Sequence, residues 1–177
     1  MNELEALAAQ VDRITAEQAI HQLAYRYALA TDSRDLDTLV GLFADDVQVG
    51  REERGRPALK AFFAQSLRGI GVSILQVTNH VIDFDDDDHA HGVVYCRGEI
   101  EVGDRWVIQT IAYFDTYGRR GGHWYFLRRR HRLWYGADVL ERPLGLPPAN
   151  WPEHHTGKGE LPELWPTWQA FWEHDQA

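Results

Sequence analysis

The chain has 177 residues, 44% of them hydrophobic, which is enough for one domain with a substantial core. Its net charge of −9 disfavours binding to nucleic-acid phosphates, and no apolar run approaches the ~20 residues that span a membrane. The single cysteine, Cys96, excludes an intramolecular disulfide and favours a reducing compartment, so we expect a cytoplasmic protein.

The N-terminal part of the chain is predicted to be helical. Thr15 and Gln18 have the spacing of a capping box, and apolar residues recur behind them at helical intervals. Further along, Pro57 suits the first turn of a helix because a proline lacks the N–H that this position leaves unpaired. Three helices are therefore expected, at about residues 16–31, 35–44 and 57–68, with a short strand at 47–50 between the last two.

After Gly71 the apolar residues recur every second position instead, which indicates strands. Four long strands are predicted, at residues 73–84, 90–102, 106–117 and 124–135. The segments between them are rich in Asp and Gly, which favour turns. Four consecutive strands joined by turns form an antiparallel meander. With the three helices, they predict an α+β fold in which a curved sheet wraps around the helices.

The basic run in FLRRRHRLWY, residues 126–135, alternates within the last predicted strand. Residues 127, 129, 131, 133 and 135 would face one side of the sheet, and residues 126, 128, 130, 132 and 134 the other. The run is then divided between two surfaces, whereas a nucleic-acid site needs a contiguous cluster. We interpret it as structural or as part of a cavity.

The strand at 90–102 has one face of small apolar residues, which are Ala90, Gly92, Val94, Cys96, Gly98 and Ile100. Small side chains leave space, which favours a pocket between sheet and helices; the alternative is close packing of a helix onto the glycines. His89 and His91 share a strand face, but no third metal ligand is evident, so we interpret them as surface residues and predict no metal site.

The tail, residues 136–177, contains six of the seven prolines and four of the seven tryptophans. Flexible linkers lack such aromatic residues. We therefore expect a docked C-terminal extension rather than a second domain, with Trp165, Trp168 and Trp172 packed on the mouth of the barrel or on another subunit.

Three polar residues are candidate site residues, each with a structural alternative. Asp32 ends the first predicted helix; an enclosed carboxylate could act as a base, although Asp is also common at helix caps. Tyr27 lies on the buried side of the same helix. His131 lies in the last strand, where a lone histidine is either structural or catalytic.

Three stretches, AYRYALATDSRDLDTLVGLFADDV, VTNHVIDFDDDDHAHGVVY and GGHWYFLRRRHRLWY, resemble the SnoaL-like branch of the nuclear transport factor 2-like superfamily. The resemblance covers about residues 10–135 and implies a cone-shaped α+β barrel with a deep, mainly apolar pocket. It divides the chain into a barrel domain, 1–135, and the extension, 136–177. Members include polyketide cyclases, scytalone dehydratase, bile-acid 7α-dehydratase and ketosteroid isomerase, most of which use no cofactor.

The resemblance also implies site residues. Tyr27 and Asp32 match the Tyr and Asp of the dehydratase-type sites, and the polar position of the last strand falls near His131. The histidine that many relatives carry before the TN pair is replaced here by Leu75. His80 is close in sequence, but its strand parity is opposite to that of Leu75, so it would face away unless a bulge intervenes.

We therefore expect a cofactor-independent lyase or isomerase acting on a small, apolar, oxygenated molecule such as a polyketide, steroid or terpenoid intermediate. Asp32 and His131 would transfer the proton, and Tyr27 would bind a carbonyl or developing enolate. The expected substrate-binding residues are Leu75, Asn79, His80, Gly98 and Arg130. The rival interpretation is a binding or interaction module without catalysis. Apolar residues on both strand faces predict a homodimer joined through the outer sheet faces.

Overall fold

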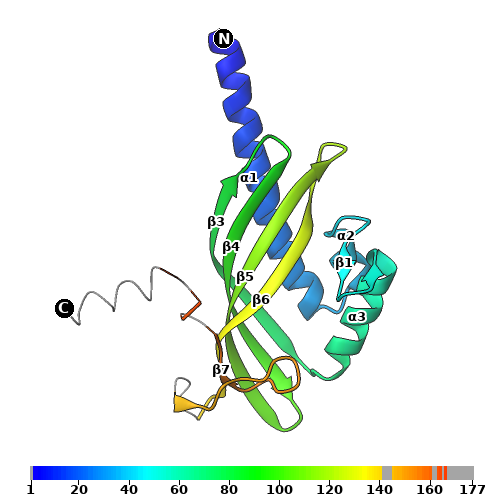
Figure 1. Ribbon diagram of the computed structural model, residues 1–177, viewed down its shortest axis with the longest axis vertical. Helices are drawn as coiled ribbons and strands as arrows, with labels where there is room; N and C mark the ends of the chain where they lie inside the picture. Colours follow the sequence, from blue (N-terminus) through cyan, green and yellow to red (C-terminus); the bar gives the residue numbers. More distant parts are fainter. Residues whose placement is uncertain (1, 141–144, 161–162, 165, 167–177) are drawn as a thin grey trace, which may run out of the picture.

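The computed structural model describes residues 2–140, 145–160, 163–164 and 166. It confirms an α+β fold of N-terminal helices followed by a curved antiparallel sheet (Figure 1). The helices are α1 (Glu3–Asp32), α2 (Leu36–Gly41) and α3 (Arg56–Arg68). None of the helices in these residues is long and apolar enough to span a membrane.

Helix α1 is longer than the sequence pattern predicted. It begins at Glu3 rather than near residue 16, and its capping box is formed by Asn2 and Glu5. The predicted cap at Thr15 is wrong because the residues before it, rich in Ala, Leu and Glu, are equally good helix formers. The N-terminal turns of α1 extend beyond the sheet (Figure 1).

The short elements between α2 and β3 close one side of the fold. Strands β1 (Gln48–Val49) and β2 (Glu53–Arg54) form a small antiparallel pair, and Gly55 caps α3 at a φ of +89° that favours glycine. Helix α3 carries a proline in its first turn, as predicted.

The main sheet has the order β3-β4-β5-β6-β7, and every neighbouring pair is antiparallel. The strands are β3 (Ser73–Phe84), β4 (His89–Val102), β5 (Arg105–Arg120), β6 (His123–Asp138) and β7 (Gly157–Lys158). The predicted meander is confirmed; β3 has the predicted bounds, and β4, β5 and β6 are longer than expected. The turn between β5 and β6 consists of Gly121 and Gly122, which both have positive φ, so β5 continues to Arg120.

Register shifts decide which side chains face the helices. On β3 one extra residue lies between Val77 and His80, and β6 has one extra residue at each of two shifts against β5. Because side chains alternate between the two faces of a strand, one extra residue turns every side chain past the bulge to the opposite face. One inward row consequently contains Val94, Tyr113 and His131, and the next contains Gly92, Asp115 and Arg129.

The space between sheet and helices is packed with side chains. A buried cluster near the middle of α1 includes Ile20, Tyr117 and Phe126, and a second includes Cys96, Ile111 and Leu133. The six small residues of β4 are all buried. A Cβ on Gly92 would lie 2.5 Å from the carbonyl oxygen of Val81, and one on Gly98 3.2 Å from Leu75. At these two glycines the space is filled by residues of the neighbouring strands, and not by a helix as the alternative expected.

Candidate functional site

The centre of the interior is a buried ion pair between β5 and β6. Arg129 donates from Nε and a terminal nitrogen to the two carboxylate oxygens of Asp115, at 2.9 and 2.7 Å. The Arg129 and Asp115 side chains are 5% and 0% exposed. Burial alone would lower the pKa of Arg129, but the charge and hydrogen bonds of Asp115 outweigh it and raise that pKa.

Aromatic rings surround the guanidinium of Arg129. Its central carbon lies 4.3 Å from the ring centre of Tyr27, 4.2 Å from Tyr113 and 4.3 Å from Phe126. Such cation–π contacts are strongest where water is excluded. The arrangement fixes one cation in the middle of an apolar interior.

A chain of hydrogen bonds leads from this ion pair to the surface. The hydroxyl of Tyr117 donates to Asp115 at 2.9 Å and is 2.9 Å from Nε2 of His80. Nδ1 of His80 is 3.0 Å from Nδ1 of His21, whose Nε2 lies 3.8 Å from Glu17. Because the Tyr117 hydroxyl gives its proton to a carboxylate, His80 must donate from Nε2 and accept from His21.

His80 reaches this position through the bulge on β3. Strand parity from Leu75 would turn it outward, but the shift between Val77 and His80 returns it to the inner face. Burial, together with the nearby His21 and Arg129, lowers the pKa of His80 to about 3. The imidazole is therefore neutral at neutral pH, as the hydrogen-bond chain requires.

His131 points inward from β6, as expected. Its ring lies edge-on to Tyr113 at 5.5 Å and is stacked on Trp151 at 4.7 Å. Burial, with the positive charges of Arg129 and Arg132, lowers the pKa of His131 to about 4. Its Nδ1 is buried and has no hydrogen-bond partner among the described residues.

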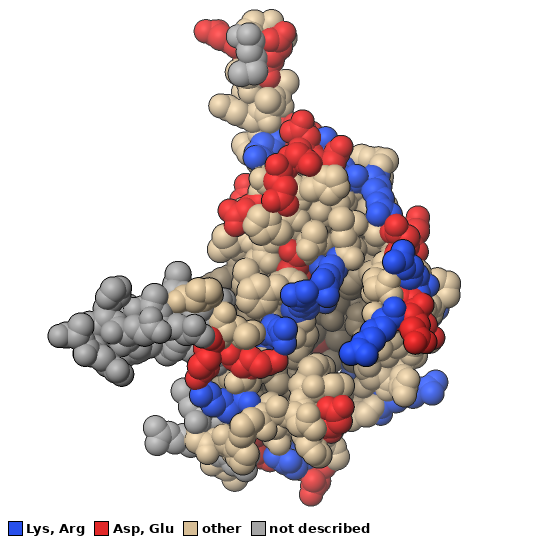
Figure 2. Space-filling model, in the orientation of Figure 1, with Lys and Arg blue, Asp and Glu red and all other residues tan. Residues whose placement is uncertain are grey.

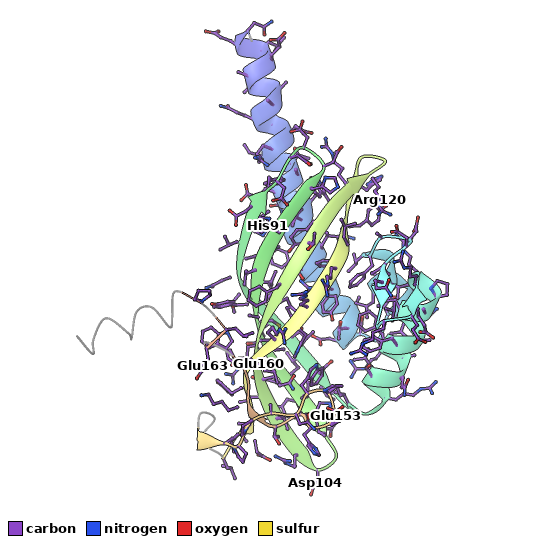
Figure 3. All side chains as sticks on the ribbon, in the orientation of Figure 1. His91, Asp104, Arg120, Glu153, Glu160 and Glu163 are labelled. Atoms are coloured by element: carbon purple, nitrogen blue, oxygen red, sulfur yellow. The ribbon has the colours of Figure 1, made fainter. Side chains whose placement is uncertain are left out.

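The cover over His131 comes from the C-terminal extension. Residues 145–160 return along β6, where β7 pairs with Tyr135 and Gly136, and Gln109 donates to the carbonyl of His155 at 3.2 Å. The labels of Glu153 and Glu160 in Figure 3 mark this segment, which lies beside the lower half of the sheet. The expected docking of Trp165, Trp168 and Trp172 lies outside the described residues.

Asp32 and Tyr27 point to different parts of the interior. Asp32 accepts hydrogen bonds from the hydroxyl of Ser73 at 2.9 Å and from the N–H of Leu75 at 2.8 Å, which joins the end of α1 to β3. Tyr27 lies against Arg129 instead, and burial raises the pKa of its hydroxyl. No hydrogen bond or ion pair joins Asp32 to His131 within the described part of the chain.

The expected substrate-binding residues are dispersed. Leu75 and Gly98 are neighbours on the inner face of β3 and β4, and His80 belongs to the hydrogen-bond chain. Asn79 is exposed at the bulge, and Arg130 is exposed on the outer face of β6. The strand faces assigned to the basic run are confirmed from Arg128 to Leu133, but the bulges move Phe126 to the inner face with Arg129.

Sequence reasoning missed the carboxylate that Arg129 pairs with. Asp115 is the one charged residue between Val107 and Gly118, a stretch that otherwise reads as a buried strand. An isolated charge in such a strand requires a partner, and that signal could have identified it.

Among the described residues no group of three His, Cys, Asp or Glu side chains could hold a metal ion. His89 and His91 pair with Asp86 and Asp85 at the surface.

Comparison with known proteins gives a family match and many similar structures. The sequence pattern of the SnoaL-like domain matches residues 12–130. No curated protein is matched. A structure assigned as a scytalone dehydratase, from Novosphingobium aromaticivorans, is 22% identical with a TM-score of 0.64, over 76% of this chain and 94% of that one. A hexachlorocyclohexane dehydrochlorinase from Novosphingobium barchaimii is 20% identical with a TM-score of 0.68, over 75% and 96%. At these identities the likeness concerns the fold.

Proposed function

Because the chain belongs to the SnoaL-like domain family, we propose that it catalyses a cofactor-independent proton transfer, as a lyase or isomerase, on a small, apolar, oxygenated molecule. The dehydratase and the dehydrochlorinase of similar fold are both named for eliminations. We therefore test first the removal of a proton from carbon, a step that eliminations and isomerisations can share.

The observation that carries the proposal is the unpartnered Nδ1 of His131. Buried polar atoms in proteins almost always have a hydrogen-bond partner, so an unpaired one points to a ligand or a water molecule. Because the pKa of His131 is lowered to about 4, its imidazole is neutral at neutral pH and can accept a proton. His131 is thus the proposed base.

Tyr27 and Arg129 are the groups suited to stabilise negative charge. Burial keeps the Tyr27 hydroxyl protonated by raising its pKa, so it can donate a hydrogen bond to a carbonyl or developing enolate. The Arg129 guanidinium lies against the Tyr27 ring, and Asp115 holds it in place. These donors are fixed before a substrate arrives, which is what transition-state stabilisation needs.

Asp32 remains part of the proposal because the resemblance implies it as a catalytic carboxylate. Its bonds to Ser73 and to the Leu75 N–H orient the carboxylate at the end of α1. We propose that Asp32 assists His131 in proton transfer. A cytoplasmic location is also proposed, since the one cysteine, Cys96, is a buried free thiol.

Deuterium uptake from D2O into 2-tetralone, an apolar ketone with acidic C–H bonds, tests the proposal. The wild type should accelerate the exchange, and His131→Gln should lower the rate about 100-fold or more, as expected for loss of a general base. Asp32→Asn should also lower it. His91→Gln is the matched control, because His91 is exposed on β4, and it should exchange as fast as the wild type.

A binding module without catalysis is the second candidate. The packed interior and the engagement of Asp32 by Ser73 and Leu75 favour it. Under this alternative 2-tetralone would bind, as seen by saturation-transfer NMR, while its deuterium exchange stayed at the buffer rate. That result would refute the catalytic proposal.

A further inference from the structure

One face of α1 presents a row of large apolar side chains to solvent. Six side chains on this helix are between 44% and 75% exposed: Leu4, Leu7, Val11, Ile14, Tyr25 and Leu29. By contrast, the exposed large apolar residues of the described strands are Ile74 and Val81, both on β3. We call the six residues the outer stripe.

The outer stripe lies opposite the face that α1 gives to its own sheet. An α-helix turns about 100° per residue, so Leu4, Leu7, Val11 and Ile14 fall within a sector of about 80°. The centre of the buried set on the same helix, which includes Ala16, Ile20, Leu23 and Ala24, is about 160° away. The sheet of the same copy therefore cannot cover the outer stripe.

The spacing of the outer stripe fits another helix. Leu4, Leu7, Val11 and Ile14 are three, four and three residues apart, the a and d positions of a heptad. A shallow groove lined by Leu4, Leu7 and Val11 with Ala8, Asp12 and Thr15 follows the N-terminal half of the helix. A narrow seam of this kind is typical of helix–helix packing, whereas packing on a sheet uses a wider apolar face.

We propose that the outer stripe is the contact between two copies of this chain, with α1 of one copy packed antiparallel on α1 of the other. A two-fold axis makes one surface complementary to itself, so a single stripe suffices for a closed dimer. In this pairing Leu4 and Leu7 face Tyr25 and Leu29 of the second copy, and the bodies lie on opposite sides of the helix pair. The proposal does not depend on the catalytic function.

The available area is sufficient for a stable dimer. Fully burying a Val, Leu or Ile removes roughly 60–120 Å² of apolar surface, so the partly exposed stripe offers about 400 Å² per copy. Since about 65% of a homodimer interface is apolar, two stripes imply a total of about 1,200 Å². This value reaches the lower limit for stable, specific interfaces.

Charge selects the partner and the orientation. Figure 2 shows acidic side chains at the tip of α1 and where the helix enters the body. Glu3 and Glu5 in the first turn disfavour anionic membranes and nucleic acids as partners. A parallel pair would also bring these acidic turns together, whereas an antiparallel pair separates them and places the two helix dipoles side by side in opposite directions.

Light scattering of the full-length protein after size-exclusion chromatography tests the proposal. The wild type at micromolar concentration should have the mass of a dimer. Leu7→Glu combined with Ile14→Glu should give a monomer with unchanged circular dichroism, because neither side chain belongs to the core. Ala9→Glu is the matched control: it adds charge on the opposite, exposed face of the same turns and should leave the dimer intact.

Cross-linking with a short bis-maleimide reports the orientation. Leu7→Cys with Tyr25→Cys should give efficient cross-linked dimers, and Leu7→Cys alone should not; the native Cys96 is buried and does not compete. A monomeric wild type, a dimer that survives Leu7→Glu with Ile14→Glu, or a dimer equally lost in Ala9→Glu would overturn the proposed contact. Efficient cross-linking by Leu7→Cys alone would overturn the antiparallel arrangement.

Discussion

At the scale of residues, the interior depends on the bidentate pair of Asp115 and Arg129. Both side chains are almost completely buried, and the cation contacts three aromatic rings. A buried pair of this kind contributes little net stability compared with an apolar pair, but loss of one partner leaves an unpaired charge in an apolar interior. The two residues must therefore be considered together.

We expect Asp115→Asn to lower the free energy of unfolding by about 3–5 kcal/mol, because Arg129 then remains buried without a counter-charge. Replacing both residues, Asp115→Leu with Arg129→Met, should cost much less than the single change. Urea denaturation at pH 7 measures both. Equal losses for the single and double variants would show that the charge imbalance is not the cause.

The orientation of the hydrogen-bond chain can be observed directly. Because Tyr117 donates to Asp115, His80 should be the Nε2–H tautomer at pH 7 in long-range ¹H–¹⁵N NMR spectra. Tyr117→Phe removes the acceptor for this N–H, so the tautomer should change or become mixed. A wild-type His80 in the Nδ1–H form would contradict the proposed direction of the chain.

His131 should make stability dependent on pH. Its folded pKa of about 4 lies below the ordinary value of 6.5, so the unfolded chain binds the proton more tightly. The contribution of His131 to the free energy of unfolding is present above pH 6.5 and is lost as the pH falls towards 4. The loss amounts to about 3 kcal/mol. Measured by urea denaturation, the loss of stability between pH 7 and pH 4 should be smaller in His131→Phe by about this amount. An identical loss in both proteins would refute the prediction.

At the scale of elements, the segment at residues 145–160 acts as the cover of His131. Trp151 stacks on the imidazole, although 41% of the residue remains exposed, and among the described residues it also contacts the ring of His155. That the whole extension, residues 136–177, docks on the barrel stays a prediction. Its boundary after Tyr135 stays a prediction.

Removing this cover should expose His131. We expect Trp151→Ala to make His131 reactive towards diethyl pyrocarbonate at pH 7, as detected by peptide mass spectrometry, whereas the wild-type residue stays unmodified. Modification of the exposed His91 serves as the internal control, because it should be equal in both samples. If His131 reacted equally in the two proteins, Trp151 would not control access to it.

At the scale of the whole molecule, two parts of the chain lie outside the region that matches the SnoaL-like domain. The match covers residues 12–130, whereas the first turns of α1 and the segment over His131 lie outside it. The first carries half of the proposed dimer contact, and the second covers the proposed base. The expected dimer through the outer sheet faces stays a prediction, but the exposed apolar residues favour α1 as the contact.

A dimer of this kind links stability to concentration. If folding and association are coupled, the Tm of the wild type should rise with protein concentration between about 1 and 100 μM, since dilution favours the dissociated state. The Tm of Leu7→Glu with Ile14→Glu should not change over this range. Differential scanning calorimetry measures both, and a wild-type Tm independent of concentration would argue against coupling.

The sequence by itself determined the types and order of the three helices and four long strands and the inward position of His131, but not the short strands β2 and β7. These follow from local periodicity and turn residues, as with the four strands between Ser73 and Asp138 and the glycine pair at 121 and 122. Only the tertiary structure decided that His80 faces inward and that Arg129 pairs with Asp115. The reason is that bulges on β3 and β6 exchange strand faces, and their positions depend on pairing between strands, which a single sequence does not encode locally.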